Sequence, residues 1–152
     1  MKYIIFSLLF TVIHTISYTV AGMLALKVSK DLYEEQKRLI DYVRDMSVEE
    51  ERRHVEKWFL PAQLVRGLLM SVVLFPIIGF LGEATYIMRV LFLGGLMIIY
   101  TDFACAVPFP HNIEGFVYMK SKYINRKAMG KLNLEMIMYS VFFGLSAGWF
   151  LF

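Results

Sequence analysis

Cysteine is almost absent from this chain of 152 residues, which contains only Cys105. A single cysteine cannot form a disulfide within the chain, and no Cys/His pairing has the spacing of a zinc site. The sequence also lacks a glycine-rich phosphate loop and any nucleophile–base motif. These absences argue against a disulfide-stabilised fold and dithiol redox chemistry, and they predict no cofactor.

Charged residues are also scarce. They make up 19% of the chain, against about 25% in an average soluble domain, while 58% of the residues are hydrophobic. Of the 29 charged residues (16 basic plus 13 acidic), 17 fall in residues 27–60 and six in residues 108–131. The basic residues therefore flank long apolar runs. This distribution excludes a soluble enzyme, a disordered tail and a nucleic-acid-binding domain as the primary interpretation.

Four apolar stretches are long enough to cross a bilayer, whose core needs about 20 helical residues. They cover approximately residues 3–26, 61–81, 84–107 and 132–152. The first has about 24 residues, more than the roughly 7–15 apolar residues of a signal peptide, so we expect it to be retained. The sequence predicts an all-α polytopic membrane protein, a single transmembrane domain over residues 1–152 folded as a four-transmembrane-helix bundle.

The distribution of lysine and arginine predicts the orientation of these spans. Residues 27–60 contain eight basic residues and residues 108–131 contain five, whereas the opposite side has only Lys2. Basic connections stay in the cytoplasm. We therefore expect residues 27–60 and 108–131 to be cytoplasmic and both termini to lie outside.

The first connection, residues 27–60, has the pattern of a helical hairpin. An apolar stripe predicts its first helix and comprises Leu32, Leu39, Val43 and Met46. Ser47 and Glu50 form an S-x-x-E capping box, which predicts the start of the second helix. Two interpretations stay open: the hairpin solvates the cytoplasmic ends of the spans, or it is a docking surface for a partner.

Two short motifs in the connections are weak metal candidates. Glu51 and His54 have the Glu-x-x-His spacing of di-iron bundles, and His111 and Glu114 have the reverse order. Such a site needs two Glu-x-x-His helices and two further glutamates. The chain offers one in the right order, so we expect no metal.

The basic connection, residues 108–131, has a net charge of +4, because five basic residues face one acid. Pro108 and Pro110 end the preceding helix, and aromatic and basic residues alternate after Gly115. Anionic head groups attract such juxtamembrane clusters. We expect an interfacial segment with head-group contacts from Lys120, Lys122, Arg126 and Lys127; the alternative is that these cations only set the topology.

Polar residues inside the spans suggest a site, because an ionisable group in a membrane is expensive. One stripe of the first span comprises Ser7, Thr11, His14 and Tyr18. A second group lies in the cytoplasmic third and comprises Arg66, Asp102 and Glu135. Either Arg66 and Asp102 form an ion pair while Glu135 reaches the interface, or all three form a polar pocket with Tyr100 and Tyr139 nearby.

Small residues and a proline predict how the spans pack. Ser140, Gly144 and Gly148 recur every four residues, the pattern that lets membrane helices approach closely. Gly94 and its neighbour Gly95 have the same effect in the third span. We expect Pro76 to kink the second span.

The architecture resembles two known classes of membrane protein. Its size, its four spans and its long first connection are similar to the membrane-associated proteins of eicosanoid and glutathione metabolism. The second span, residues 61–69, lacks the Arg/Asn/Glu pattern that those enzymes present to glutathione. An outward N-terminus, a cytoplasmic hairpin and an arginine in a neighbouring span also resemble membrane insertases of the oxidase-assembly type, in architecture alone.

Three functional classes follow from these patterns. The first is a small binding or transport-type membrane protein with a polar site in the cytoplasmic third, which we expect to be oligomeric because four helices enclose little space. The second is a membrane-embedded enzyme that acts on a lipid or lipophilic substrate, with Asp102, Glu135 or His111 as acid or base. The third is a structural or assembly subunit. The absence of catalytic motifs favours the first class.

Overall fold

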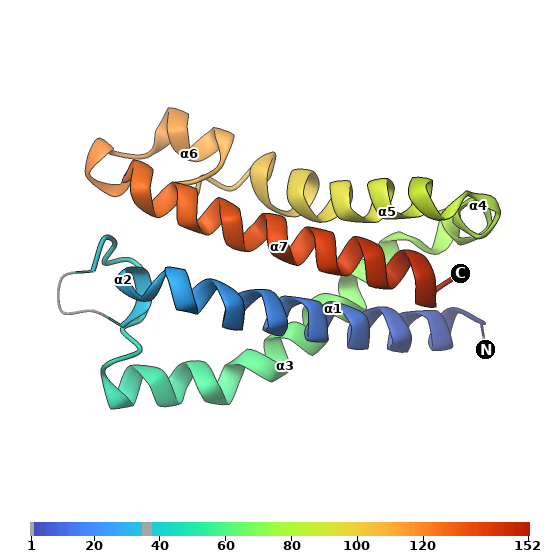
Figure 1. Ribbon diagram of the computed structural model, residues 1–152, viewed down its shortest axis with the longest axis horizontal. Coiled ribbons are helices and arrows are strands. Elements are labelled where there is room, and N and C mark those ends of the chain that lie inside the picture. Colours follow the sequence, from blue (N-terminus) through green and yellow to red (C-terminus); the bar gives the residue numbers. More distant parts are fainter. Residues whose placement is uncertain (1, 35–37) are drawn as a thin grey trace.

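The computed structural model describes residues 2–34 and 38–152, and every regular element in them is helical (Figure 1). The long helices are α1 (Lys2–Val28), α3 (Glu49–Val73), α5 (Tyr86–Gly95) and α7 (Arg126–Phe150). The short elements are α2 (Lys30–Tyr33), the 3-10 turn η1 (Phe75–Ile77), α4 (Ile78–Glu83), the π-helix η2 (Leu96–Phe103), α6 (Ile113–Tyr118) and the 3-10 turn η3 (Ser121–Tyr123). The predicted all-α class is confirmed for the described residues.

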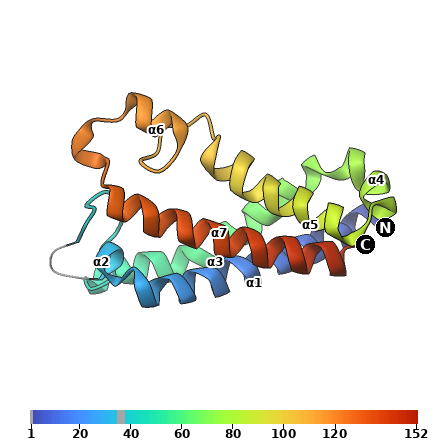
Figure 2. The same ribbon diagram turned by 45° about the horizontal axis from the view of Figure 1, so that its top comes forward.

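The long helices run along the molecule and join its two ends (Figures 1 and 2). α1 packs against both α3 and α7, and α7 packs in turn against α5. Both chain termini and α4 lie at one end, which we call the terminal end. α2, α6 and the irregular segments lie at the opposite end, which we call the loop end.

Glycines allow the close helix contacts that the sequence predicts. A Cβ atom on Gly67 of α3 would lie 2.9 Å from the Cα atom of Thr11 on α1. A Cβ atom on Gly144 of α7 would lie 2.9 Å from the carbonyl oxygen of Val90 and 3.2 Å from the Cα atom of Gly94, both on α5. Because the clashing atoms are backbone, the helices reach this separation only with glycine at these positions.

Within the described residues, two stretches are long and apolar enough to cross a membrane: α1, and Tyr86–Phe103, which joins α5 and η2. A third is added if Glu49–Val73 and Phe75–Glu83 are one span bent by 48°. This bend lies beside Pro76, so the predicted kink is confirmed. α7 is not among these stretches; four of its first ten residues are charged. Two to three spans are therefore supported, and the four-span bundle is not confirmed.

The predicted helical hairpin is wrong in its first half. α2 has only four residues, and residues 38–48 are irregular. The capping box is also wrong, because α3 begins after Val48, while the Ser47 hydroxyl donates to the Asp45 carboxylate at 2.6 Å. This local turn competes with a helix N-cap for Ser47. The second half is helical as predicted, but it forms the first part of α3, which runs through Pro61 without a break.

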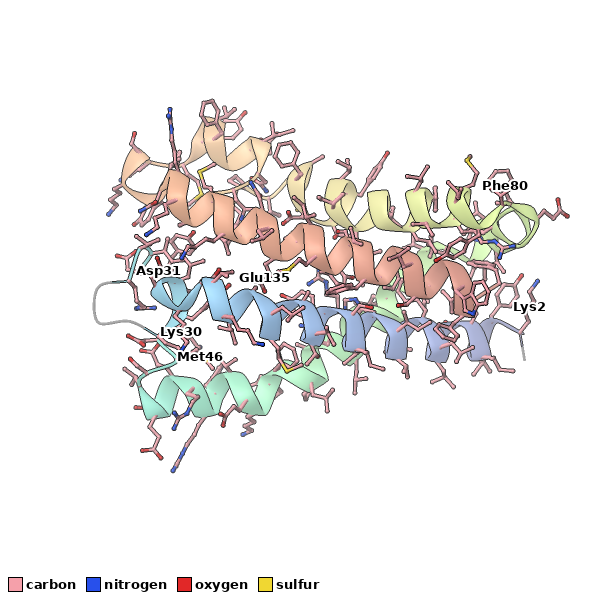
Figure 3. All side chains as sticks on the ribbon, in the orientation of Figure 1. Lys2, Lys30, Asp31, Met46, Phe80 and Glu135 are labelled. Carbon is pink, nitrogen blue, oxygen red and sulfur yellow. The ribbon has the colours of Figure 1, made fainter. Side chains whose placement is uncertain are left out.

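Apolar side chains are exposed along the middle of the long helices. Leu8 and Ile16 on α1 are each 57% exposed, and Leu69 on α3 is 66% exposed. α5 and α7 present the same kind of surface through Leu91 and Val141. Charged residues such as Lys30 and Asp31 gather at the loop end (Figure 3). A surface this apolar exceeds what a soluble monomer exposes and is compatible with a lipid environment.

Candidate functional site

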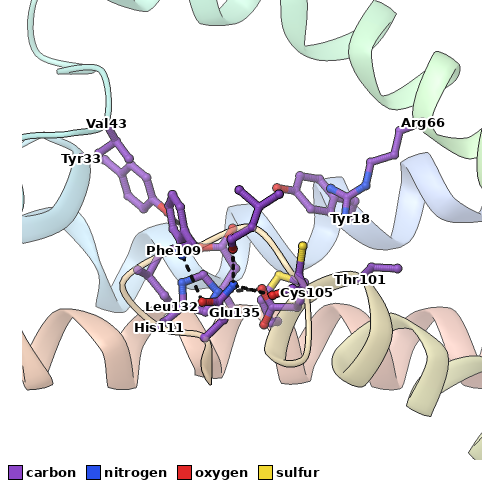
Figure 4. Close-up of a pocket in the computed structure, with 14 residues that line it drawn as sticks. Tyr18, Tyr33, Val43, Arg66, Thr101, Cys105, Phe109, His111, Leu132 and Glu135 are labelled. Carbon is purple, nitrogen blue, oxygen red and sulfur yellow. Dashed lines mark hydrogen bonds and ion pairs between the residues drawn. The ribbon is translucent and has the colours of Figure 1, made fainter. Parts of the chain in front are cut away.

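A cavity of about 390 Å³ lies at the loop end, and we call it the polar cavity (Figure 4). Its walls come from α1, α2, α3, η2, α7 and residues 105–112. Arg66, Asp102 and Glu135, the three charged residues that the sequence analysis groups together, all line it. The cavity has the size of a small-molecule site.

Arg66 enters the polar cavity from α3. Its guanidinium carbon lies 5.5 Å from the centre of the Tyr18 ring on α1, a cation–π contact. Within residues 2–34 and 38–152, no carboxylate oxygen lies within 4 Å of its nitrogen atoms. The predicted Arg66–Asp102 ion pair is therefore wrong. Arg66 enters the cavity as a cation without a counter-ion among the described residues.

Asp102 pairs with His111 instead. The His111 Nε2 atom lies 2.6 Å from the Asp102 Oδ1 atom, and the two side chains are 8% and 12% exposed. When the Nε2–H group donates a hydrogen bond to the Asp102 carboxylate, a neutral ring carries its lone pair at Nδ1. That Nδ1 atom is buried and has no partner in the described part of the chain. His111 thus lines the cavity while one of its ring nitrogens is buried without a partner.

Residues 104–112 fold back because prolines and one asparagine shape the loop. Pro108 and Pro110 cannot continue η2. The Asn112 side-chain oxygen accepts from the backbone N–H of Phe109 at 3.0 Å and, as the N-cap of α6, from that of Gly115 at 2.7 Å. A Cβ atom on Gly115 would overlap the Phe109 carbonyl oxygen. This packing holds His111 over Asp102.

Asp102, the partner of His111, lies in the π-helix η2, which sets its position. The backbone N–H of Ala104 donates to the carbonyl of Ile99 at 2.7 Å, a bond that skips five residues where an α-helix skips four. Thr101 donates its hydroxyl to the Met97 carbonyl at 2.5 Å. π-helical turns are frequent at functional sites because they rotate side chains out of the α-helical register.

Glu135 faces the same cavity from α7 and is half-buried. The Tyr33 hydroxyl donates to its Oε2 atom at 3.2 Å, a long bond for an oxygen donor. Burial and the Glu135 carboxylate raise the pKa of Tyr33, so the phenol stays neutral and can donate. No other side-chain hydrogen bond to Glu135 occurs within the described residues. The carboxylate therefore has spare capacity to accept hydrogen bonds.

His14 and Tyr139 lie in the interior and not in the cavity wall. Tyr139 lies 2.6 Å from Nδ1 of His14, and the Gln63 side-chain oxygen lies 3.1 Å from Nε2. Both residues are fully buried. The neutral imidazole has both nitrogens satisfied, as expected for a packing residue. Tyr18, the last residue of the predicted stripe, does line the cavity.

The remaining predicted residues lie at the surface of the loop end. Lys120, Lys122 and Arg126 are exposed, and Lys127 contacts Asp31 at 3.3 Å. Tyr100, which the pocket hypothesis places near the charged residues, is 75% exposed and does not line the cavity.

The metal candidates do not come together. Glu51 accepts a hydrogen bond from the Asp45 backbone N–H at 2.7 Å, His54 is exposed, and His111 pairs with Asp102. Across residues 2–34 and 38–152, no group of three or more His, Cys, Asp or Glu side chains could hold a metal ion.

Tyr33 and the free nitrogen of His111 are the site features that the sequence analysis misses. The two prolines after η2 are a signal that could have placed His111 near Asp102, since they force the chain to turn back within nine residues. Comparisons with protein-family models, curated proteins and solved structures give no match.

Proposed function

We propose that this chain is an integral membrane protein of the binding or transport type, and that its polar cavity binds a small zwitterionic ligand. The observation that carries the proposal is a pair of opposite charges, Arg66 and Glu135, that line one cavity without an ion pair between them. Charges inside a span persist where function requires them. A ligand with both charges would satisfy each of them.

The chemistry of the lining assigns the two ends of such a ligand. Arginine binds phosphate or carboxylate through two parallel hydrogen bonds, so Arg66 suits the anionic group. Glu135 accepts hydrogen bonds, and an ammonium group has up to three donors to offer. The cavity thus favours an amine that also carries a phosphate or a carboxylate.

In the proposed membrane arrangement the chain has four spans, and the loop end lies in the cytoplasm. The four spans are α1, α3 with α4, α5 with η2, and α7. The exposed apolar middle of these helices and the basic loop end support it. In this setting Lys120, Lys122 and Arg126 would contact anionic lipid head groups at the inner leaflet. A further copy of the chain is the expected partner for transport.

The binding test uses purified protein in a maltoside detergent and measures thermal unfolding. The probes are phosphoethanolamine, which carries both charges, and its two halves, inorganic phosphate and ethanolamine. We expect phosphoethanolamine to raise the midpoint more than either half does. Arg66→Gln should remove the response to phosphate, and Glu135→Gln should remove the response to ethanolamine.

Arg89→Gln is the matched control, because Arg89 binds the carbonyl oxygens of Leu81 and Gly82 and does not line the polar cavity. Its response to phosphoethanolamine should equal that of the wild type. An absent response in the wild type, or equal responses in the wild type and both cavity variants, contradicts the proposal.

A membrane-embedded enzyme is the second candidate function. The Asp102–His111 pair favours it, because a carboxylate that holds an imidazole in place is an arrangement used in general acid–base catalysis. The two functions differ in one outcome. An enzyme returns a chemically changed ligand, whereas a binding or transport protein returns it intact, and mass spectrometry of the released ligand separates them.

A further inference from the structure

A second cavity of about 390 Å³ adjoins the polar cavity and has an apolar lining. It lies between α1 and the first half of α3, and we call it the apolar cavity. Met23 and Leu26 of α1, Val55 and Phe59 of α3, and Met46 form most of its wall. This cavity takes up part of the contact surface between α1 and α3, which would otherwise be filled by side chains.

The two cavities share part of their walls. Tyr18, Tyr33 and Glu135 line both of them. The Tyr33 hydroxyl and the Glu135 carboxylate meet at this boundary, and their 3.2 Å bond is the only polar link across it in the described residues. Gly22 leaves room beside Glu135, since a Cβ atom there would lie 3.7 Å from the Oε1 atom. The boundary between the two cavities is therefore made of the side chains of Tyr18, Tyr33 and Glu135.

We infer that the ligand is a zwitterionic amphiphile whose charged head occupies the polar cavity and whose single apolar chain occupies the apolar cavity. This inference rests on the proposed function, because the head group is the zwitterion proposed above. An apolar chain gains free energy when it leaves water for an apolar cavity. The adjoining apolar volume gives such a chain a place that a purely polar ligand would leave empty.

The walls of the apolar cavity distinguish it from an ordinary lipid-facing helix surface, because they combine side chains of α1, α2, α3 and α7. The exposed faces of α1 and α3 contact bulk lipid through residues such as Val12 and Val73. The ring centres of Tyr18 and Phe59 lie 6.1 Å apart in the wall of the apolar cavity, and the exposed side chain of Met23 leaves it partly open. Its volume of about 390 Å³ limits how much of a chain it can hold, so chain length should matter.

The test is a chain-length series of single-chain amphiphiles with a phosphoethanolamine head, added to the full chain in lipid nanodiscs. We expect binding to tighten roughly threefold to fourfold for each added methylene and to stop tightening once the chain fills the cavity. A series with the same chains and an uncharged glycerol head reports partition into the nanodisc. It should show no dependence on Arg66 or Glu135.

Two variants narrow the apolar cavity from opposite sides, Gly22→Leu on α1 and Val55→Phe on α3. Either should shorten the chain length at which binding levels off, and the other serves if one variant does not fold. Val73→Phe, on the lipid-facing side of α3, is the matched control and should leave the series unchanged.

Three outcomes separate this inference from the proposed function. Binding of the phosphoethanolamine head with no dependence on chain length overturns the amphiphile and leaves the proposed function standing. Dependence on chain length that persists in Arg66→Gln and Glu135→Gln overturns both. A plateau that is unchanged in both narrowed variants overturns the assignment of the chain to the apolar cavity.

Discussion

The buried imidazole of His14 and the buried imidazole of His111 have opposite surroundings. His14 contacts Tyr139 at 2.6 Å and Gln63 at 3.1 Å, so each ring nitrogen has a partner. His111 contacts Asp102 through one nitrogen, and the other has no partner within the described residues. Both rings are more than nine-tenths buried. Burial therefore does not separate the two sites, but hydrogen-bond satisfaction does.

The contrast is partial among the nearby polar groups, because the buried hydroxyls of Thr15 and Ser140 also have no partner within the described residues. Elsewhere on the polar stripe of α1, the hydroxyl of Ser71 donates to that of Ser7 at 2.8 Å, and Thr11 donates to the Ser7 carbonyl. Around His111, the charges of Arg66 and Glu135 lack ion-pair partners among the described residues. A satisfied buried network stabilises and specifies a core. An unsatisfied one lowers stability and persists where a ligand completes it.

The largest expected effect is on the His14 side. His14→Leu removes the partner of the buried Gln63 side-chain carbonyl and one of the two partners of the Tyr139 hydroxyl, which also donates to the Met97 sulfur at 3.0 Å. An unsatisfied buried group costs about 1–3 kcal/mol. We expect the free energy of unfolding in detergent to fall by about 2–4 kcal/mol. Chemical unfolding followed by tryptophan fluorescence measures this loss.

His54→Leu is the control for this variant, because His54 is an exposed histidine on α3. It should change the free energy of unfolding by less than about 0.5 kcal/mol. Equal losses in the two variants would show that His14 is not part of a stabilising network.

A much smaller effect on stability is expected on the cavity side. Arg66→Gln loses a cation–π contact of roughly 0.5–1 kcal/mol and also removes a charge from the interior, so the two effects offset. Glu135→Gln retains an acceptor for Tyr33. We expect both variants to unfold within about 1 kcal/mol of the wild type, while ligand binding is lost. A loss as large as that of His14→Leu would mean that the cavity charges are structural.

The sequence could predict which residues gather in the polar cavity but not how they pair. Hydropathy and charge positions place Arg66, Asp102 and Glu135 at one depth of the membrane, and all three line the cavity. The pairing depends on side-chain contacts between distant segments. His111 reaches Asp102 only because the loop turns back on Gly115, and no periodic pattern encodes that turn.

The hairpin prediction shows a different limit. Apolar spacing over residues 32–46 fits a helix, yet Leu32 packs against Ala128 and Leu132 of α7 from the short helix α2, and Ile40 does so from an irregular segment. Here tertiary contacts outweigh the helical pattern, as they commonly do for short segments. In contrast, the first long apolar run, residues 3–26, forms the single helix α1 as the sequence predicts.

The smallest expected effect lies outside both sites, at the link between α2 and α7. Asp31 binds Lys131 and Lys127 of α7, and the hydrogen bond from Lys131, with Lys127, lowers the pKa of the Asp31 carboxyl below its usual range. A lowered folded pKa means that the contribution is present above about pH 4 and disappears as the pH falls through the folded pKa. Because the pair is near the surface, we expect Asp31→Asn to cost about 0.5 kcal/mol at neutral pH.

The pH profile of unfolding tests this link against the two histidine sites. The difference between wild type and Asp31→Asn should be constant near neutral pH and should vanish in strong acid, since protonated Asp31 resembles asparagine in charge. High salt should also reduce the difference, because a pair at the surface is screened. A difference that survives in acid would mean that Asp31 acts through packing. Tyr33 lies two residues after Asp31 on α2, at the boundary between the two cavities. If Asp31 acts through packing, the ion pair is not what holds α2, and with it Tyr33, against α7.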